Sequence, residues 1–351
     1  GYSWLTNTLD PEEGGVRLAV FAAMAAMLVV ALAVPRAFGS DGVTFGVSYF
    51  IVRAILLVLY GVAGRGNRDL LRSVLKIVPA GILGPGLLVV AGFTHGSAQL
   101  MLWGAALIID YLGVLVGDVG AWSISPEHFV ERNGLIIIIA LGESIFAIGI
   151  GAAGLPLDAG VIAAALLGVA IAAALWWSYF DWVAYVAQAT LAETAGAKRA
   201  ALARDAYSYL HLPMVAGIVL FALGLKTSLA NVSGSLGTIP ALGLCGGVAL
   251  YLLAHVALRL RIQGGFGRGR PMATVLLIGL FPLVRHVSAV SALALVLVAC
   301  ASLIGYEAIR HRESRAFIRS RRGEFTVEEV RAYIGEHEGR SARGNRSDHA
   351  T

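Results

Sequence analysis

The strongest constraint on the fold is a series of about ten apolar runs, each long enough to cross a bilayer as an α-helix. The chain is 58% hydrophobic and only 14% charged, whereas soluble domains carry roughly a quarter charged residues. We therefore expect an all-α fold, a polytopic transmembrane helix bundle in contact with a lipid bilayer. The expected spans are roughly 16–37, 43–64, 72–93, 98–117, 134–152, 159–183, 206–226, 240–261, 271–287 and 289–309.

The basic residues of the loops predict how the spans are oriented. When the chain is threaded through these spans, nearly all loop arginines and lysines fall on one side, and only Arg36, Lys226 and Arg285 fall on the other. Basic loops mark the cytoplasmic side, so both termini of this chain are expected there. The net charge of +5 therefore indicates topology, and it does not predict a nucleic-acid partner.

An internal repeat is expected, with two membrane units and a tail. The pattern Tyr49-x-x-x-Arg53 aligns with Tyr251-x-x-x-His255, and the span that follows each contains proline. The first unit, 1–133, would hold four spans, and the second, 134–310, would hold six in the same orientation. The alternative is that apolar spans simply resemble one another. Residues 311–351 are expected to form a basic cytoplasmic tail with one short amphipathic helix over 326–334.

Four segments of the chain resemble the bacterial low temperature requirement A family of membrane proteins. They are HFVERNGLIIIIALGESIFAIGIGAAGLP (128–156), ALWWSYFDWV (174–183), ARDAYSYLHLPMVAGI (203–218) and WLTNTLDPEEGGVRLAV (4–20). The resemblance covers Trp4 to about Arg310, and it implies a multi-pass protein of the bacterial cytoplasmic membrane. Family members usually begin with a further segment of the type E-L-F-F-D-L-V-F-V, so this chain is expected to be N-terminally truncated. The resemblance implies no reaction and no substrate.

Ionisable residues within the spans are the candidates for function, because a charge at mid-bilayer costs about 2.5–3.5 kcal/mol. Glu143 lies about ten residues past the start of its span, which is about 15 Å at the rise of a helix and places it at the midplane. Ser144 follows it. Arg53 lies near the middle of its own span, and it is the expected partner of Glu143.

Asp110, His211 and His255 lie in the cytoplasmic halves of their spans. Together with Glu143, Arg53 and Ser144 they are expected to line a polar cavity that opens toward the cytoplasm, as in ion and substrate pathways. The alternative is a structural ion pair that fixes helix register. For His211 a second alternative is a role in capping a loop.

His128, Glu131 and Arg132 have the i, i+3, i+4 spacing that places side chains on one helix face. We expect them to form an ion-paired lid at the cytoplasmic end of the Glu143 span. No second histidine stands in register with them, so no metal site is predicted here.

Trp176, Trp177 and Asp181 stand at the cytoplasmic end of another span. Aromatic residues at this depth are typical of an interfacial belt, and substrate stacking is the alternative.

The sequence leaves three functional classes. The chain has no Walker or dinucleotide-binding loop, no H-E-x-x-H and no G-x-S-x-G, so no cofactor is predicted. The favoured hypothesis is a secondary transporter or permease for an unknown small solute or a proton. The alternatives are a membrane-embedded enzyme acting on a lipid or isoprenoid, and a structural or stress-related protein without transport. The sequence does not predict an oligomeric state.

Overall fold

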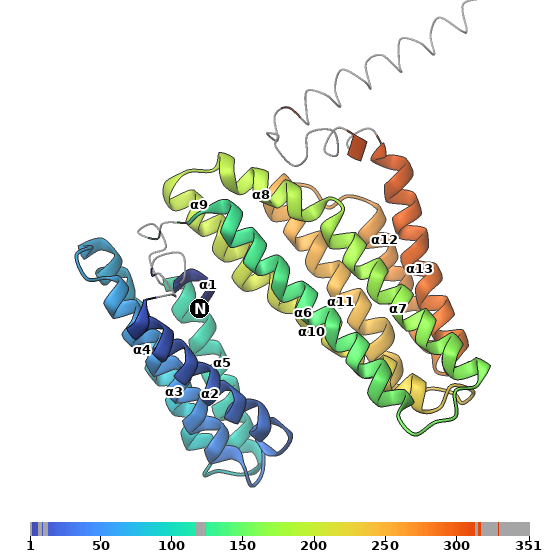
Figure 1. Cartoon of the computed structure of the whole chain (residues 1–351), viewed down its shortest axis with the longest axis horizontal. Helices are drawn as coiled ribbons and strands as arrows, with labels where there is room; N and C mark the ends of the chain where they lie inside the picture. Colours follow the sequence, from blue (N-terminus) through green and yellow to red (C-terminus); the bar gives the residue numbers. More distant parts are fainter. Residues whose placement is uncertain are drawn as a thin grey trace, which may run out of the picture. The chain divides into compact units, whose positions relative to one another are not determined.

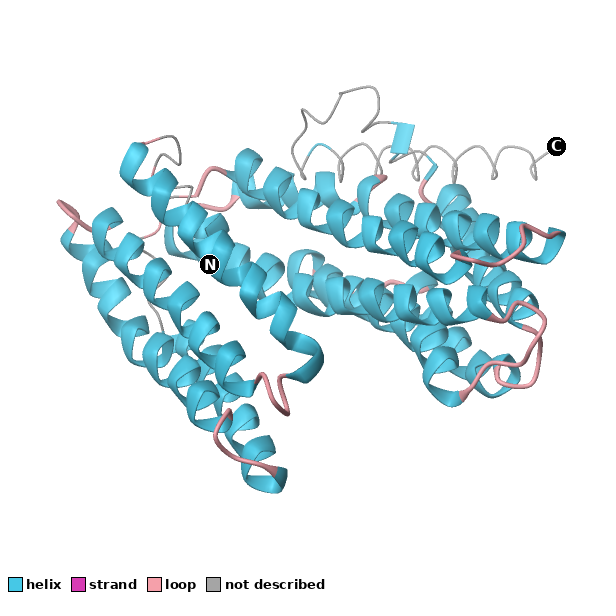
Figure 2. Cartoon of the chain, turned by 60° about the horizontal axis from the view of Figure 1, so that its bottom comes forward, coloured by secondary structure: helices cyan, strands magenta, loops and turns pink. Residues whose placement is uncertain are grey.

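The computed structural model describes residues 2–5, 9, 13–116, 122, 124–312, 315, 316 and 329, which form helices and the loops between them (Figure 2). The expected tail helix over 326–334 lies outside the described residues, apart from Glu329. Two compact units divide the chain. The first comprises Gly1–Ser125 with Gly196–Ala201, and the second comprises Pro126–Ala195 with Leu202–Thr351.

The first unit is a bundle of helices that pack in chain order, α2 on α3, α3 on α4 and α4 on α5 (Figure 1). Its core includes Leu5, Leu56, Tyr60 and Leu70, which are all buried. Its elements are α1 (Tyr2–Leu5), α2 (Gly14–Ala33), the 3-10 turn η1 (Val34–Arg36), α3 (Gly42–Ala63), α4 (Arg68–Ala91) and α5 (Gly96–Val116).

The second unit is built around α10 and α11, which pack on each other along their lengths, with α6 against α10 and α7 against α13. Its elements are α6 (Pro126–Ala152), α7 (Ala159–Phe180), α8 (Val183–Glu193), the end of α9 (Gly196–Ala203), the π-helix η2 (Arg204–Leu210), α10 (His211–Ala230), α11 (Thr238–Gln263), α12 (Gly269–Val284) and α13 (Ala289–Arg310). α11 is the central helix of this unit, because most of its apolar stretch is buried.

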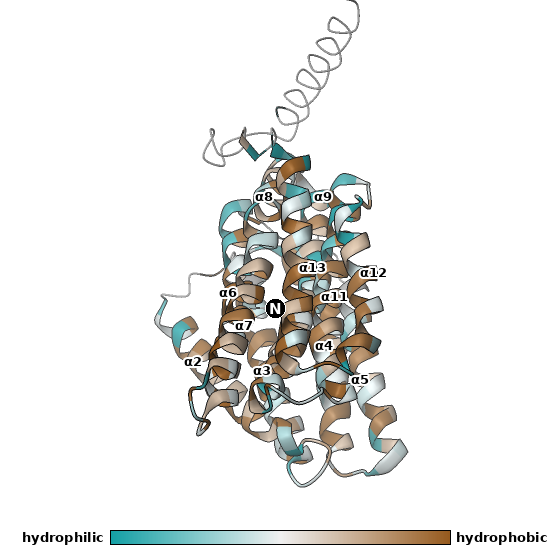
Figure 3. Cartoon of the chain, turned by 90° about the vertical axis from the view of Figure 1, so that its right-hand side faces the viewer, coloured by the Kyte–Doolittle hydropathy of each residue, from teal (hydrophilic) through white to brown (hydrophobic). Residues whose placement is uncertain are grey.

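The all-α membrane architecture is confirmed. Each expected span falls on a helix, and eight helical segments of the described chain are long and apolar enough to cross a membrane. α12, with 16 residues, is apolar but shorter. Large apolar side chains such as Leu18, Ile139 and Ile309 are exposed on the outer surfaces, and hydropathy colouring shows apolar stretches along most of the helices (Figure 3). Such surfaces suit hydrocarbon rather than water.

Two element boundaries differ from expectation. α6 is one continuous 27-residue helix from Pro126, so the expected lid and the Glu143 span belong to the same helix. Pro126 stands at the first helical position, where the missing N–H costs nothing. The expected span 206–226 begins inside the π-helix η2 and continues as α10. Periodicity alone does not reveal a π-helix. π-Helices are rare overall, and those that occur are often at functional sites.

Glycines let α10 and α11 approach closely. A Cβ atom on Gly217 would lie 2.6 Å from the carbonyl oxygen of Gly247, and a Cβ on Gly247 would lie 2.6 Å from that of Gly217. Backbone atoms cannot move aside as a flexible side chain can. Small residues at such crossings are the usual means of packing helices within a membrane.

Substituting Gly217→Ala is therefore expected to destabilise the second unit by about 1–3 kcal/mol, the usual cost of overpacking. Thermal unfolding of the purified protein in detergent would measure it. Gly279→Ala in α12 is the matched control, because a Cβ there meets nothing within 4 Å. If both variants melt at the wild-type temperature, the close contact is not essential to the unit.

Candidate functional site

The first unit contains a partly buried ion pair between two helices. Arg53 of α3 donates to Asp110 of α5 at 2.5 Å from Nη2 to Oδ1. The Tyr49 hydroxyl donates to the other carboxylate oxygen of Asp110 at 3.2 Å. The carboxylate also lies against α4, where a Cβ on Gly84 would stand 3.2 Å from Oδ1. The charge of Arg53 is thus compensated within its own unit.

Arg53 and its expected partner Glu143 belong to different units, and Arg53 is paired with Asp110 within its own unit. Glu143 lies exposed on α6, between Ile139 and Phe146, which are 73% and 71% exposed. Neither a hydrogen bond nor an ion pair joins Glu143 to any residue that the structure describes. Ser144, the next residue along the helix, is fully buried. Depth in the span was used to match the two charges, but depth does not determine the helix face on which each residue lies.

A hydrogen-bonded histidine and tyrosine lie inside the second unit, where α10 follows the π-helix. His211 Nδ1 lies 2.9 Å from the Ala206 carbonyl oxygen, and Nε2 lies 2.8 Å from the Tyr179 hydroxyl. A carbonyl only accepts, so Nδ1 carries the proton, and Nε2 accepts from the tyrosine. The Tyr207 ring lies beside His211 with centroids 4.7 Å apart. His211 is thus buried and makes two hydrogen bonds, one to Tyr179 and one within the π-helix, so neither bond goes to a loop.

His255 of α11 lies close to this group and has an unused nitrogen. Its Nδ1 donates to the Tyr251 carbonyl oxygen at 2.8 Å, and the edge of Tyr179 meets its ring with centroids 5.9 Å apart. The side chain is 1% exposed, and no described residue bonds its Nε2. In the neutral ring Nε2 is an acceptor. A buried acceptor without a donor is uncommon and calls for an explanation.

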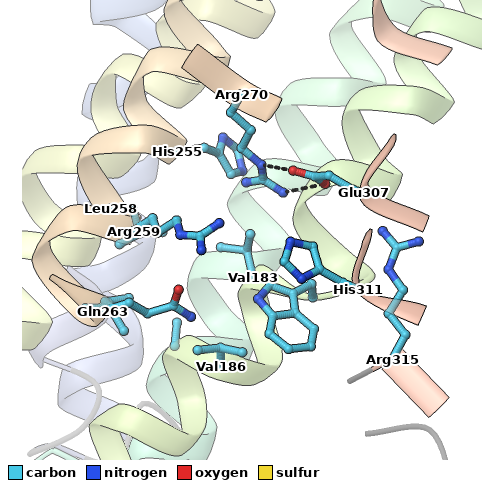
Figure 4. Close-up of a pocket in the computed structure, with 13 residues that line it drawn as sticks. Val183, Val186, His255, Leu258, Arg259, Gln263, Arg270, Glu307, His311 and Arg315 are labelled. Atoms are coloured by element: carbon cyan, nitrogen blue, oxygen red, sulfur yellow. Dashed lines mark hydrogen bonds and ion pairs between the residues drawn. The ribbon is translucent and has the colours of Figure 1, made fainter. Parts of the chain in front are cut away.

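Two buried ion pairs surround this region. Arg270 of α12 donates two hydrogen bonds to the Glu307 carboxylate of α13, from Nε at 2.8 Å and from Nη2 at 3.3 Å (Figure 4). Its Nη2 also donates to the Ser178 carbonyl oxygen of α7 at 2.8 Å. Arg315 pairs with Asp181 at 2.7 Å, with both side chains about one-tenth exposed (10% and 9%). Asp181, expected at an aromatic interface, is therefore part of an ion pair.

A pocket opens beside these pairs, with about 510 Å³ of space including its mouth. The α11 residues His255, Arg259 and Gln263 form one wall, with Arg270 drawn beside His255, and Glu307 and His311 lie across from them (Figure 4). Further lining residues include Trp182, Val183 and Arg315. The ring of Trp182 stacks on His311 with centroids 5.9 Å apart.

The pocket carries one uncompensated positive charge. Arg270 and Arg315 are paired with carboxylates. Arg259 forms no hydrogen bond or ion pair with the described part of the chain, and its Nε is buried without a partner. Its guanidinium group points from α11 toward His311 across the pocket (Figure 4). The site is therefore electropositive.

The structure brings together only some of the expected site residues. His255 lines the pocket, and His211 is linked to it through Tyr179. Arg53 and Asp110 form their separate pair in the first unit.

The expected lid residues and the two expected interface tryptophans are more exposed than His211 and His255. His128 and Glu131 lie 4.0 Å apart and are 69% exposed each, and Arg132 is half-buried. Trp176 and Trp177 are exposed as well. Within the described ranges, no three His, Cys, Asp or Glu side chains gather as metal ligands would.

Sequence reasoning missed Arg259, Arg270 and Glu307 as site residues, because the two arginines counted only as basic loop residues and Glu307 was not considered. Two signals were available. His255, Arg259 and Gln263 recur at every fourth position of one helix, and Glu307 is an acidic residue in the last turn of a span that otherwise ends in basic residues.

Long apolar helices with lipid-type outer faces and paired charges within the bundle define a multi-pass helical membrane protein. The family model of the bacterial low temperature requirement A protein matches residues 1–305, so the chain belongs to that family. The chain is also 29% identical, over 331 residues, to an uncharacterized protein of Rhizobium meliloti, covering 88% of this chain and 78% of that protein. No solved structure matches the chain.

The Arg53–Asp110 pair predicts a measurable coupling. Arg53→Gln and Asp110→Asn should each lower the melting temperature, because each leaves one charge unpaired between helices. The double variant should lose less unfolding free energy than the sum of the two single losses. The difference, which is the coupling energy, should be about 0.5–3 kcal/mol. Additivity of the two single losses would contradict the pairing.

His311 predicts a pH-dependent stability. Burial lowers its pKa below the ordinary value, Glu307 acts in the opposite direction, and Arg259, Arg310 and Arg315 lower it further. The unfolded chain therefore takes up a proton as pH falls through about 6.5, while the folded protein resists it. Relative to His311→Gln, the wild type should lose melting temperature between about pH 7.5 and pH 5.5. A pH-independent difference would show that His311 titrates normally.

Proposed function

We propose that the protein is a secondary transporter or permease for a small solute or a proton, and that the path runs through its second unit. The observation that carries this proposal is that His255 lines the pocket and that its buried Nε2 has no partner among the described residues. A structural pair needs no open space beside it. Polar groups within a membrane that face a cavity are characteristic of substrate and proton pathways.

The depth of His255 supports a path rather than a surface site. His255 lies eight residues before the end of α11 at Gln263, which is about 12 Å along the helix. Tyr179 packs on it from behind and donates to His211. This arrangement extends the line of polar groups from the pocket into the bundle.

Glu143 and Ser144 belong to the same proposal as a second, acidic position on the path. An exposed carboxylate between Ile139 and Phe146 would be costly against lipid. We propose that this face of α6 meets protein or water in the membrane, with His128, Glu131 and Arg132 gating the end of the same helix.

Two wider features are also proposed. The first is that the Arg-rich end of the second unit faces the cytoplasm, in keeping with the positive-inside rule. The second is a repeat relating α2–α5 to α10–α13. Each set packs in chain order, and α4 and α12 both contain proline. Inverted or parallel repeats with sites between the repeated units are common among secondary transporters.

Flux through sealed proteoliposomes tests the proposal. With a pH-sensitive dye inside and imposed gradients of protons and a panel of small solutes, the wild-type protein should carry flux, and both His255→Gln and Glu143→Gln should abolish it. His286→Gln is the matched control, because that exposed histidine lies at the opposite end of the second unit.

Normal flux in the His255→Gln protein would contradict the proposed path. Lipid turnover in detergent, where no sealed compartment exists, would instead favour the membrane-enzyme alternative.

A further inference from the structure

We infer that the pocket of the second unit binds a phosphate group that carries a single negative charge and a hydroxyl proton. The inference rests on the proposed function only in taking the pocket as a binding site, and it specifies the chemistry of the ligand. Two α11 side chains line the pocket with hydrogen-bonding capacity left over: Arg259, which forms no hydrogen bond or ion pair with the described residues, and His255, whose Nε2 has no partner among them.

Arg259 supplies the charge complement. The other lining arginines, Arg270 and Arg315, are already held by carboxylates at 2.8 Å and 2.7 Å. A guanidinium group with several donors in a planar fork is suited to two oxygens of a carboxylate, phosphate or similar oxyanion. One free cation in a partly enclosed site fits one negative charge, and a second negative charge would be left uncompensated.

His255 supplies the second requirement, because its free Nε2 is an acceptor. Nδ1 is committed as a donor to the Tyr251 carbonyl, so the neutral ring can only accept at Nε2. A single group that satisfies both residues therefore presents a hydrogen as well as an anionic oxygen. Carboxylate, sulfate and phosphodiester groups carry no proton of their own at neutral pH, whereas dihydrogen phosphate and singly ionised phosphomonoester groups carry both on one phosphorus.

The spacing of the two residues suits a group of this size. His255 and Arg259 stand at positions i and i+4 of α11 and so lie on the same face, with Cβ atoms about 5–6 Å apart. A single tetrahedral oxyanion can place one oxygen toward each. Gln263 continues the same face toward the mouth, and the stacked Trp182 and His311 rings add a flat wall for the rest of a larger ligand.

Binding by the purified protein in detergent tests the inference without any variant. Inorganic phosphate near neutral pH should raise the melting temperature in a saturable manner, and calorimetry should detect the same binding. Sulfate at equal ionic strength should give a clearly smaller shift, because it offers charge without a proton. Equal shifts for the two anions, or none for phosphate, would overturn the inference.

Variants then assign the binding to the pocket. Arg259→Gln should lower phosphate affinity about tenfold or more, as expected when a charge-assisted contact is lost. Arg259→Lys keeps the charge without the fork and should give an intermediate loss, which guards against a folding defect in the first variant. Arg72→Gln is the matched control, because that arginine is 75% exposed in the first unit. Unchanged affinity in both Arg259 variants would overturn the site.

The source of the phosphate is decided by comparing two preparations. If it is a free ion, phosphate should bind equally well in nanodiscs of phosphatidylcholine with and without phosphatidic acid. If it belongs to a lipid, phosphatidic acid should compete with inorganic phosphate and should copurify with the wild type but not with Arg259→Gln. Either result supports the inference, and a lipid effect independent of Arg259 contradicts it.

The binding and flux experiments fail separately. Phosphate binding without flux would leave the ligand site standing and reject the transporter. Flux of another solute without phosphate binding would support the transporter and reject the phosphate site.

Discussion

The ion pair between Arg270 and Glu307 is the interaction on which the candidate site depends. It joins α12 to α13, and the same guanidinium donates to the Ser178 carbonyl of α7. Pairing and hydrogen bonding lower the cost of such charges within a bilayer, and the contact joins three helices at one point. The pocket lies directly beside this junction, and Arg270 and Glu307 form part of its lining.

The two ionisable clusters differ in what they leave unsatisfied. In the first unit, Arg53, Asp110 and Tyr49 bond to one another, and the cluster is balanced in charge. In the second unit, Arg259 and the Nε2 of His255 have no partner among the described residues. Balanced pairs account for helix packing alone. Unsatisfied groups beside an open space are a reason to propose binding.

Much of the fold follows from the sequence, because the length and apolarity of a span are set by the bilayer and not by distant contacts. Each expected span falls on a helix, although the helix of the Glu143 span begins earlier, at Pro126. The pairing of charges did not follow. Arg53 was assigned to Glu143 from depth, yet its partner Asp110 is on α5, and depth cannot tell which faces of two helices meet.

The residues of the candidate site could also be predicted only in part. His211 and His255 were found because a histidine within a span is conspicuous. Arg259, Arg270 and Glu307 were not, because charges near helix ends normally reach water and need no partner. Only packing shows that Arg270 and Glu307 turn inward. The π-helix before His211, which places its ring against Tyr179 and Tyr207, also has no local sequence signature.

A density map of the protein in lipid nanodiscs, at a resolution that shows side chains, tests the central claim most directly. We expect non-protein density, from water or a ligand, between the Arg259 guanidinium group and the His255 imidazole. A pocket closed by protein, with a carboxylate of the chain bonded to Arg259 and no space beside His255, would contradict it.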